Sequence, residues 1–78
     1  MAPSYIQLKL FAALAAMSPV DSDRFPIQPG VSIKELLNDL DIPLAKAHLI
    51  FVDGVKQTLE TRLNGGERVG IFPPVAGG

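Results

Sequence analysis

The segment Val31-Ser-Ile-Lys-Glu-Leu-Leu-Asn-Asp-Leu40 decides how the rest of this 78-residue chain folds. Ser32 is a favourable helix N-cap, and Glu35 three residues later completes a capping box. Apolar residues at spacings of three and four then form a single stripe: Ile33, Leu36, Leu37 and Leu40. Because the other side of this helix is polar, the stripe must pack against one face of a sheet.

Strand patterns lie on both sides of this helix. Residues 5–11 alternate between apolar and polar side chains, as expected for a half-buried strand. Residues 24–28 form a second strand, whose central proline favours the edge of a sheet because proline cannot donate to a ladder. Residues 48–52 and 55–57 flank Asp53-Gly54, a pair typical of a two-residue hairpin turn. The sequence therefore predicts two strands before the helix and an antiparallel hairpin after it.

Two connections complete this pattern. Residues 12–17 have good helix propensity but are followed at once by Ser18-Pro19, so we expect a short helical or irregular segment. Residues 58–63 are expected to place Leu59 and Leu63 against the core.

A last strand begins at Arg68, because Val69 and Ile71 alternate with Gly70 and Phe72. The elements therefore run strand, strand, helix, strand, short strand, strand. One main helix packed on one face of a mixed sheet is an α+β architecture, the β-grasp or ubiquitin-like fold. We expect this fold for the chain.

Pro73-Pro74 ends the last strand, since neither proline can donate to a ladder. The sequence thus predicts a β-grasp domain at residues 1–73 and a flexible C-terminal arm at residues 74–78. Gly77-Gly78 lacks side chains and can pass through a narrow channel, and the terminal carboxylate is the arm's reactive group. The arm either presents this carboxylate for activation inside another protein or is a frayed terminus that ends in glycines.

Several apolar residues near the arm have no evident place in the core. If the helix covers the sheet face that carries Leu8, Leu49, Phe51, Val69 and Ile71, the others lie on the open face or on the arm: Ile50, Val52, Phe72, Pro74 and Val75. An uncovered apolar patch beside an arm favours a docking surface, although single exposed hydrophobic residues are common. Gly70, in the middle of a strand, either permits close approach of a partner or marks a bulge.

The composition excludes several classes of function. A net charge of −1 and a pI of about 5.6 give no electrostatic footprint for nucleic acid or an anionic membrane. Without cysteine, the chain has no disulfide, thiolate nucleophile or zinc–thiolate site. His48 has no second ligand at metal spacing, so we expect no metal. No apolar run is long enough to span a bilayer, and we expect a soluble cytoplasmic protein that is not an enzyme by itself.

The heptapeptide Phe72-Pro-Pro-Val-Ala-Gly-Gly78 resembles the C-terminal signature of the MoaD/ThiS family of ubiquitin-like sulfur carriers. Its form is closest to the MoaD branch, whose members are the small subunit of molybdopterin synthase. The order of the predicted elements also fits, so the resemblance covers nearly the whole chain. The resemblance implies that the first and last strands pair at the centre of the sheet.

The resemblance also implies a chemistry for the arm. A MoeB- or ThiF-like adenylating enzyme would use ATP to activate the Gly78 carboxylate, and a sulfur donor would then leave a thiocarboxylate there. Gly77 would give clearance, and Phe72, Pro73, Pro74, Val75 and Ala76 would position the arm in the partner. A MoaE-like large subunit would accept the sulfur for molybdopterin. No cofactor would be bound by the carrier itself.

Residues 13–17 depart from the family pattern, because MoaD-type chains often carry a charged Arg-Glu segment there. This departure keeps other acceptors open: ThiS-like thiazole synthesis, or a carrier for cysteine or another thio-metabolite. A ubiquitin-like modifier, with Gly78 in isopeptide bonds, is an alternative of a different class. A plain binding domain with an inert tail is a third.

Overall fold

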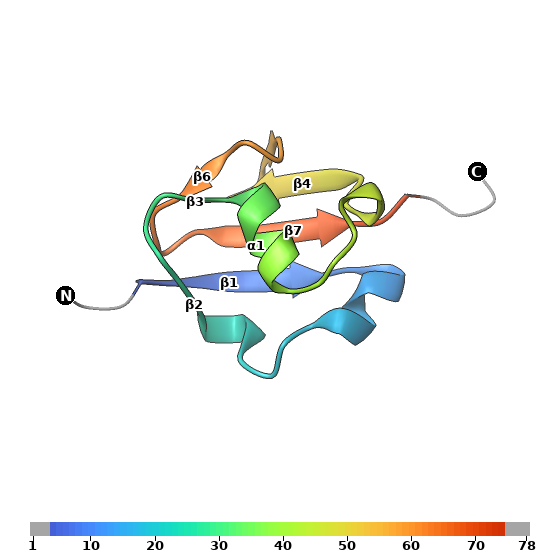
Figure 1. Cartoon of the computed structure of the whole chain (residues 1–78), viewed down its shortest axis with the longest axis horizontal. Helices are drawn as coiled ribbons and strands as arrows, with labels where there is room; N and C mark the ends of the chain where they lie inside the picture. Colours follow the sequence, from blue (N-terminus) through green and yellow to red (C-terminus); the bar gives the residue numbers. More distant parts are fainter. Residues whose placement is uncertain (1–3, 75–78) are drawn as a thin grey trace.

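The first and last strands of the domain pair side by side at the centre of one sheet. The computed structural model describes residues 4–74. Strands β1 (Ser4–Leu10) and β7 (Arg68–Phe72) run parallel, and their neighbours give the order β2-β1-β7-β4-β5 (Figure 1). The edge strands are β2 (Phe25–Ile27) and β5 (Val55–Gln57), and β4 (Leu49–Val52) lies between β7 and β5. All three pair antiparallel with their neighbours, so the sheet is mixed as predicted.

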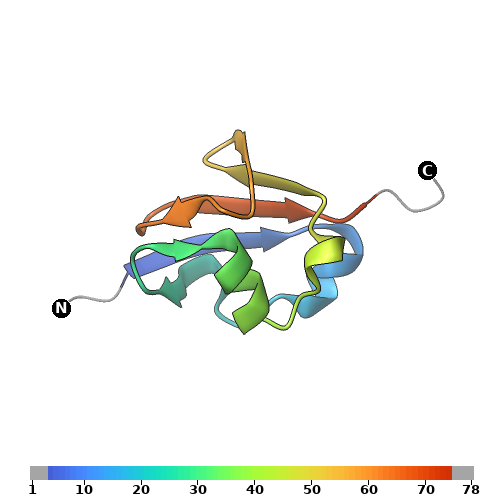
Figure 2. The same cartoon turned by 45° about the horizontal axis from the view of Figure 1, so that its top comes forward.

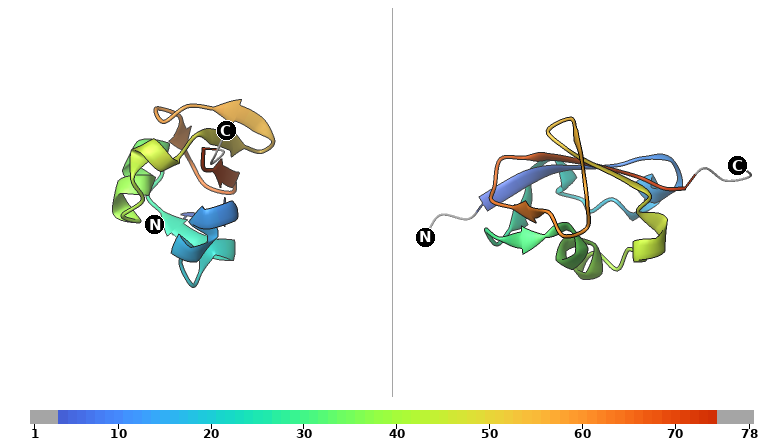
Figure 3. Two further views of the ribbon diagram at one scale, coloured as in Figure 1. Left: turned by 90° about the vertical axis from the view of Figure 1, so that its right-hand side faces the viewer. Right: turned by 90° about the horizontal axis from the view of Figure 1, so that it is seen from above.

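The helix α1 (Ile33–Asp39) lies on one side of this sheet (Figures 2 and 3). The predicted capping box is present: the Glu35 N–H donates to Ser32 Oγ, and the Ser32 N–H donates to Glu35 Oε1, each over 3.1 Å. The apolar stripe is buried against the sheet, with Leu36 2% exposed and Leu37 0% exposed. The stripe thus fixes which face of the sheet is covered.

The core between α1 and the sheet is built from aliphatic side chains of β1, α1, β4, β6, β7 and two connecting segments. Its buried members are Ile6, Leu8, Leu10, Leu14, Ile33, Leu36, Leu37, Ile42, Ile50, Leu63, Val69 and Ile71. An aliphatic core of this kind supplies the burial that stabilises a small domain.

A second, two-stranded sheet was not predicted. Strands β3 (Val31–Ser32) and β6 (Arg62–Leu63) pair antiparallel beside the start of α1. Two residues are too short for an alternating pattern to be visible in a sequence. The predicted burial of this segment is confirmed, because Leu63 is fully buried and Leu59 packs against the core.

The edge position predicted for Pro26 is confirmed by the backbone pattern. The Gly66 N–H donates to the Tyr5 carbonyl, so the backbone groups of Tyr5 point toward β7. Pro26 lies opposite Tyr5, and its nitrogen therefore points away from β1. The proline costs no ladder bond there, and its missing N–H protects the free edge against pairing with another strand.

The remaining connections are short 3-10 turns at Ala12–Met17, Ser22–Arg24 and Leu44–Lys46. The first confirms the short helical segment expected there, and it buries Leu14. The predicted hairpin turn is also present, since Asp53 and Gly54 both have positive φ, as a type I′ turn requires. Within residues 4–74, no helix is long and apolar enough to cross a membrane. The fold is the predicted α+β, β-grasp arrangement.

Candidate functional site

The register of β4 against β7 decides which side chains reach the uncovered face of the sheet. Ile50 lies opposite Ile71, and Val52 lies opposite Val69. Directly opposed residues share a face, and Ile71 is fully buried under α1. Ile50 is accordingly only 4% exposed, and Val52 packs against the core. The prediction that Ile50 and Val52 lie on the open face is therefore wrong.

Leu49 and Phe51 occupy the positions that had been expected for Ile50 and Val52. They lie opposite Phe72 and Gly70, so they face away from α1. The error has a physical cause: residues 49–52 are all apolar, and no alternation marks their inner face. A shift of one residue then exchanges the two faces of a strand.

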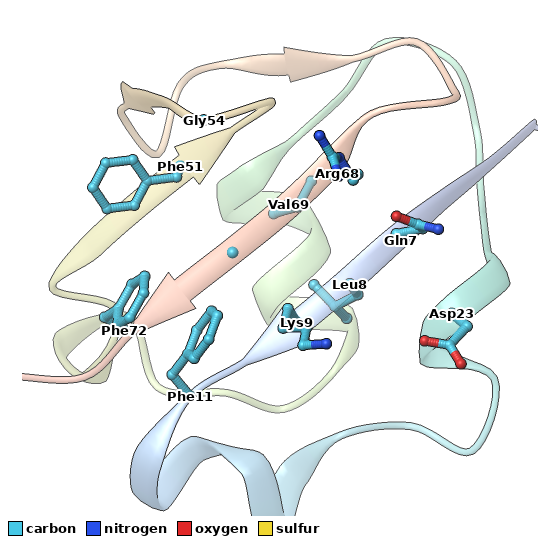
Figure 4. A pocket seen from close by; sticks show the side chains of 11 residues that line it. Gln7, Leu8, Lys9, Phe11, Asp23, Phe51, Gly54, Arg68, Val69 and Phe72 are labelled. Carbon is cyan, nitrogen blue, oxygen red and sulfur yellow. The ribbon is translucent and has the colours of Figure 1, made fainter.

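Three phenylalanines form an aromatic cluster on the open face: Phe11, Phe51 and Phe72. The rings of Phe11 and Phe72 are stacked, with centroids 4.1 Å apart and an interplanar angle of 2°. Phe51 meets Phe72 edge to face, with centroids 5.8 Å apart (Figure 4). Each side chain is half-buried, so the cluster keeps apolar area available at the surface. Phe72, which was predicted to lie on the open face or on the arm, lies on the open face.

Gly70 lies within this face and makes close contact with the cluster. Its strand is paired without interruption on both sides, opposite Lys9 and Phe51, so the predicted alternative of a bulge is excluded. A Cβ atom at Gly70 would lie 3.3 Å from Cε2 of Phe11. The close approach at this glycine is therefore made by a ring of the same chain.

Positive side chains border the aromatic cluster. Lys9 and Arg68 are exposed and line the same groove as the three rings (Figure 4). Asp23 also lines the groove. An apolar centre with a polar and charged rim is the usual composition of a protein-docking surface.

The base of the arm is held on both sides at the end of β7. The Phe11 N–H donates to the Ile71 carbonyl over 3.1 Å, and the His48 N–H donates to the Phe72 carbonyl over 2.9 Å. Pro73 is half-buried and Pro74 is exposed. The remaining predicted site residues lie outside the described residues, and their roles stay predictions: Val75, Ala76, Gly77 and Gly78.

The capping box perturbs a carboxyl on the helix, away from the aromatic cluster. The backbone N–H and the hydroxyl of Ser32 hold the pKa of Glu35 below its usual value, and Arg62 adds a smaller effect in the same direction. Within residues 4–74, no group of three or more histidine or carboxylate side chains is arranged to hold a metal ion.

The sequence places this chain in a family. The sequence model of the ThiS family matches residues 8–78, and the chain therefore belongs to the ThiS family of ubiquitin-like proteins. The predicted MoaD/ThiS resemblance is confirmed. Proteins of this family are generally small carriers rather than catalysts, and the family implies partner enzymes of the adenylating and acceptor kinds.

Solved structures share the fold. SAMP1 from Haloferax volcanii matches with a TM-score of 0.71 and 22% identity over 96% of this chain and 100% of its own. A second structure, of H. volcanii small archaeal modifier protein 1, matches with a TM-score of 0.71 and 21% identity over 92% of this chain and 99% of its own. A proposed molybdopterin converting factor, subunit 1, from Pyrococcus furiosus matches with a TM-score of 0.67 and 21% identity over 92% of this chain and 99% of its own. These identities establish the fold alone. No curated protein sequence matches the chain.

Sequence reasoning missed Phe11, Phe51 and Lys9 as site residues. A signal for Phe11 was present, because it continues the polar face of β1 after Gln7 and Lys9. An aromatic residue on the polar side of an amphipathic strand is a candidate for contact with a partner. Phe51 carried no such signal, since its neighbours on the strand are apolar as well.

Proposed function

We propose that this protein is a sulfur carrier whose Gly78 carboxylate is adenylated and then converted to a thiocarboxylate. The observation that carries the proposal is the ThiS family match, which extends through Gly77-Gly78. The aromatic cluster and the base of the arm lie at the same end of β7, and this supports docking and activation by one partner (Figure 4).

The chemistry follows from the weakness of a carboxylate as an electrophile. A MoeB- or ThiF-like enzyme transfers AMP from ATP to a Gly78 oxygen and releases pyrophosphate. A sulfur nucleophile then attacks the carbonyl carbon, and AMP leaves with that oxygen. The product carries one sulfur in place of one oxygen. In this scheme the carrier binds no cofactor, and the ATP is bound and used by its partner.

The acceptor that we propose is a pterin precursor in molybdopterin synthesis, bound by a MoaE-like large subunit. Two observations support it: the Phe-Pro-Pro-Val-x-Gly-Gly form of residues 72–78, and the shared fold with the P. furiosus protein. The name of the matching family favours ThiS-like thiazole synthesis as the alternative acceptor pathway. Both pathways use the same thiocarboxylate and differ only in the acceptor enzyme.

A second candidate function is conjugation to other proteins. The H. volcanii proteins that share this fold are named as modifiers, which favours an isopeptide bond from Gly78 to a lysine. Both functions begin with the same adenylate. They differ in the nucleophile that displaces AMP.

Intact-mass measurement separates these functions. The protein is incubated with ATP, a MoeB- or ThiF-like enzyme and sulfide, beside a variant that lacks Gly78. We expect a mass gain equal to one oxygen exchanged for sulfur in the full chain and no gain in the shortened one. Covalent adducts of higher mass in a cell extract would favour the modifier. No gain with several such enzymes, each active on its own carrier, would contradict the sulfur-carrier proposal.

A further inference from the structure

We propose that Gly70 and Phe11 are positioning residues that set the direction in which the arm leaves the domain. The inference rests on the proposed function, because direction matters only if Gly78 must reach an active site in a partner. Neither residue belongs to the arm. Their effect passes through Phe72, the last residue of β7.

The first step of the argument is the contact between Phe11 and Gly70. A Cβ atom at residue 70 would lie 3.3 Å from Phe11 Cε2, which is tighter than ordinary van der Waals contact. The absence of a side chain therefore gives the Phe11 ring its place against β7. A larger residue there must displace the ring.

The second step is the stack between Phe11 and Phe72. With centroids 4.1 Å apart and planes 2° from parallel, the Phe72 ring cannot move toward Phe11, and Phe51 meets it edge to face (Figure 4). The Phe72 carbonyl accepts from the His48 N–H at the same time. Ring and backbone of Phe72 are thus both held.

The third step is the stiffness of the two prolines that follow. Proline fixes its own φ, and it restricts the preceding residue to extended conformations. Phe72 and Pro73 each precede a proline. The orientation of Phe72 is therefore transmitted through Pro73 and Pro74 rather than lost at a flexible joint.

Backbone strain beside Phe11 is an independent sign that its position is fixed. Ala12 has a φ of 53°, in the left-handed region, which costs an L-residue about 1–2 kcal/mol. Such a conformation persists only where the surrounding structure determines it. Here it turns the chain out of β1 directly after Phe11.

Exit direction matters because it sets the region that the far end of the chain can reach. Residues 73–78 could span at most about 20 Å, so a change of about 10° in the direction of Pro73-Pro74 would displace that region by up to about 3 Å. Misplacement of a reacting group by about 1 Å can cost about 100-fold in rate. A small displacement of Phe72 is therefore large at the reacting carboxylate.

Adenylation kinetics with the MoeB- or ThiF-like enzyme separate positioning from docking. We expect Gly70→Val and Phe11→Leu to lower kcat by about tenfold or more and to change the KM for the carrier by less than about threefold. Gly70→Ala should have a smaller effect of the same kind. Phe11→Tyr keeps the ring and should retain the wild-type kcat. Lys9→Ala is the matched control for docking, because Lys9 lies opposite Gly70, and it should raise KM alone.

A rise in KM at constant kcat for Gly70→Val and Phe11→Leu would overturn the inference, because both residues would then act in docking alone. A second measurement needs no partner: residual dipolar couplings report the orientation of the Phe72 N–H bond relative to the domain. We expect this orientation to change in Gly70→Ala and to be kept in Phe11→Tyr. An unchanged orientation in Gly70→Ala and in Phe11→Leu would overturn the inference even if the sulfur-carrier proposal holds. If instead no enzyme adenylates the wild type, the proposed function fails and the couplings still test the positioning.

Discussion

The two faces of strand β7 differ in the burial and in the type of their side chains. Val69 and Ile71 point toward α1 and are 1% and 0% exposed, whereas Gly70 and Phe72 face the open side. The covered face is aliphatic. The open face combines three half-buried rings with Lys9 and Arg68. One strand of five residues thus serves both the core and the candidate site.

A small domain can in this way keep the residues that stabilise its core apart from the residues that contact a partner. Aliphatic side chains fill the closed interior at high packing density, and their removal leaves a cavity. Aromatic side chains offer a large contact area at low entropic cost, which suits a surface that meets a partner. Because successive side chains of a strand point to opposite faces, the residues that fill the core and those available for contact lie on opposite sides of β7.

The largest effect should come from the covered face. Ile71→Ala removes a fully buried side chain, and we expect the free energy of unfolding to fall by about 2–5 kcal/mol. The milder Ile71→Val should cost about 0.5–1.5 kcal/mol. Urea denaturation followed by circular dichroism gives both values. A loss below about 1 kcal/mol for the alanine variant would mean that this face is not the stabilising one.

A smaller loss of stability is expected on the open face. Phe51 is half-buried and has one edge-to-face contact, so Phe51→Ala should cost about 1–2 kcal/mol in the same denaturation experiment. Its main effect should be on binding to the adenylating enzyme, measured by calorimetry. Unchanged affinity in this variant would remove Phe51 from the docking surface.

The helix that covers the inner face depends on its cap. Ser32→Ala leaves the Glu35 N–H without its acceptor, and we expect a loss of about 1 kcal/mol in the free energy of unfolding. Ser32→Thr retains the hydroxyl and should lose less. Affinity for the adenylating enzyme should not change in either variant, since the cap lies away from the aromatic cluster.

Ala12 has a strained backbone conformation, so a substitution there should raise the free energy of unfolding instead of lowering it. Glycine adopts a positive φ without the steric cost, so Ala12→Gly should stabilise the domain by up to about 1 kcal/mol. Thermal unfolding would show a raised midpoint. Ala13→Gly, at an exposed neighbouring position, is the control and should not stabilise. A lower midpoint for Ala12→Gly would contradict the strained assignment.

The smallest effect is the acid dependence of the cap. The pKa of Glu35 is lowered in the folded state, so its contribution to stability is present above the unfolded value of 4.5 and is lost as the pH falls through the folded pKa. Denaturation midpoints of the wild type and Glu35→Gln should therefore converge in acid. Parallel curves across this range would show that the capping carboxylate does not contribute.

The sequence determined most of the fold because its local signals agree with one another. The capping box at Ser32, the stripe of α1 and the hairpin turn at Asp53-Gly54 each predicted their element correctly. The inner face of β4 could not be predicted, since residues 49–52 are uniformly apolar and only pairing with β7 sets their side. The pairing of β3 with β6 is likewise a tertiary contact without a local signature.

The candidate site was predictable only in part. Phe72 was identified from the motif, whereas Phe11 and Phe51 become part of the site through ring contacts between residues distant in the chain. The alternation along β7 indicated that Gly70 was unusual, but only the position of the Phe11 ring explains why. Contacts of this kind depend on packing, and local sequence does not encode them.

The most direct test of the division between the two faces compares adjacent residues of β4. Ile50→Val should cost about 0.5–1.5 kcal/mol of stability and Phe51→Ala about 1–2 kcal/mol, but the two substitutions alter opposite faces. The rate of thiocarboxylate formation at subsaturating carrier is measured for both by intact mass. We predict that Phe51→Ala slows it about tenfold, equivalent to about 1.4 kcal/mol, and that Ile50→Val stays within about twofold of the wild type. Equal slowing in both variants, or a wild-type rate for Phe51→Ala, would contradict the account.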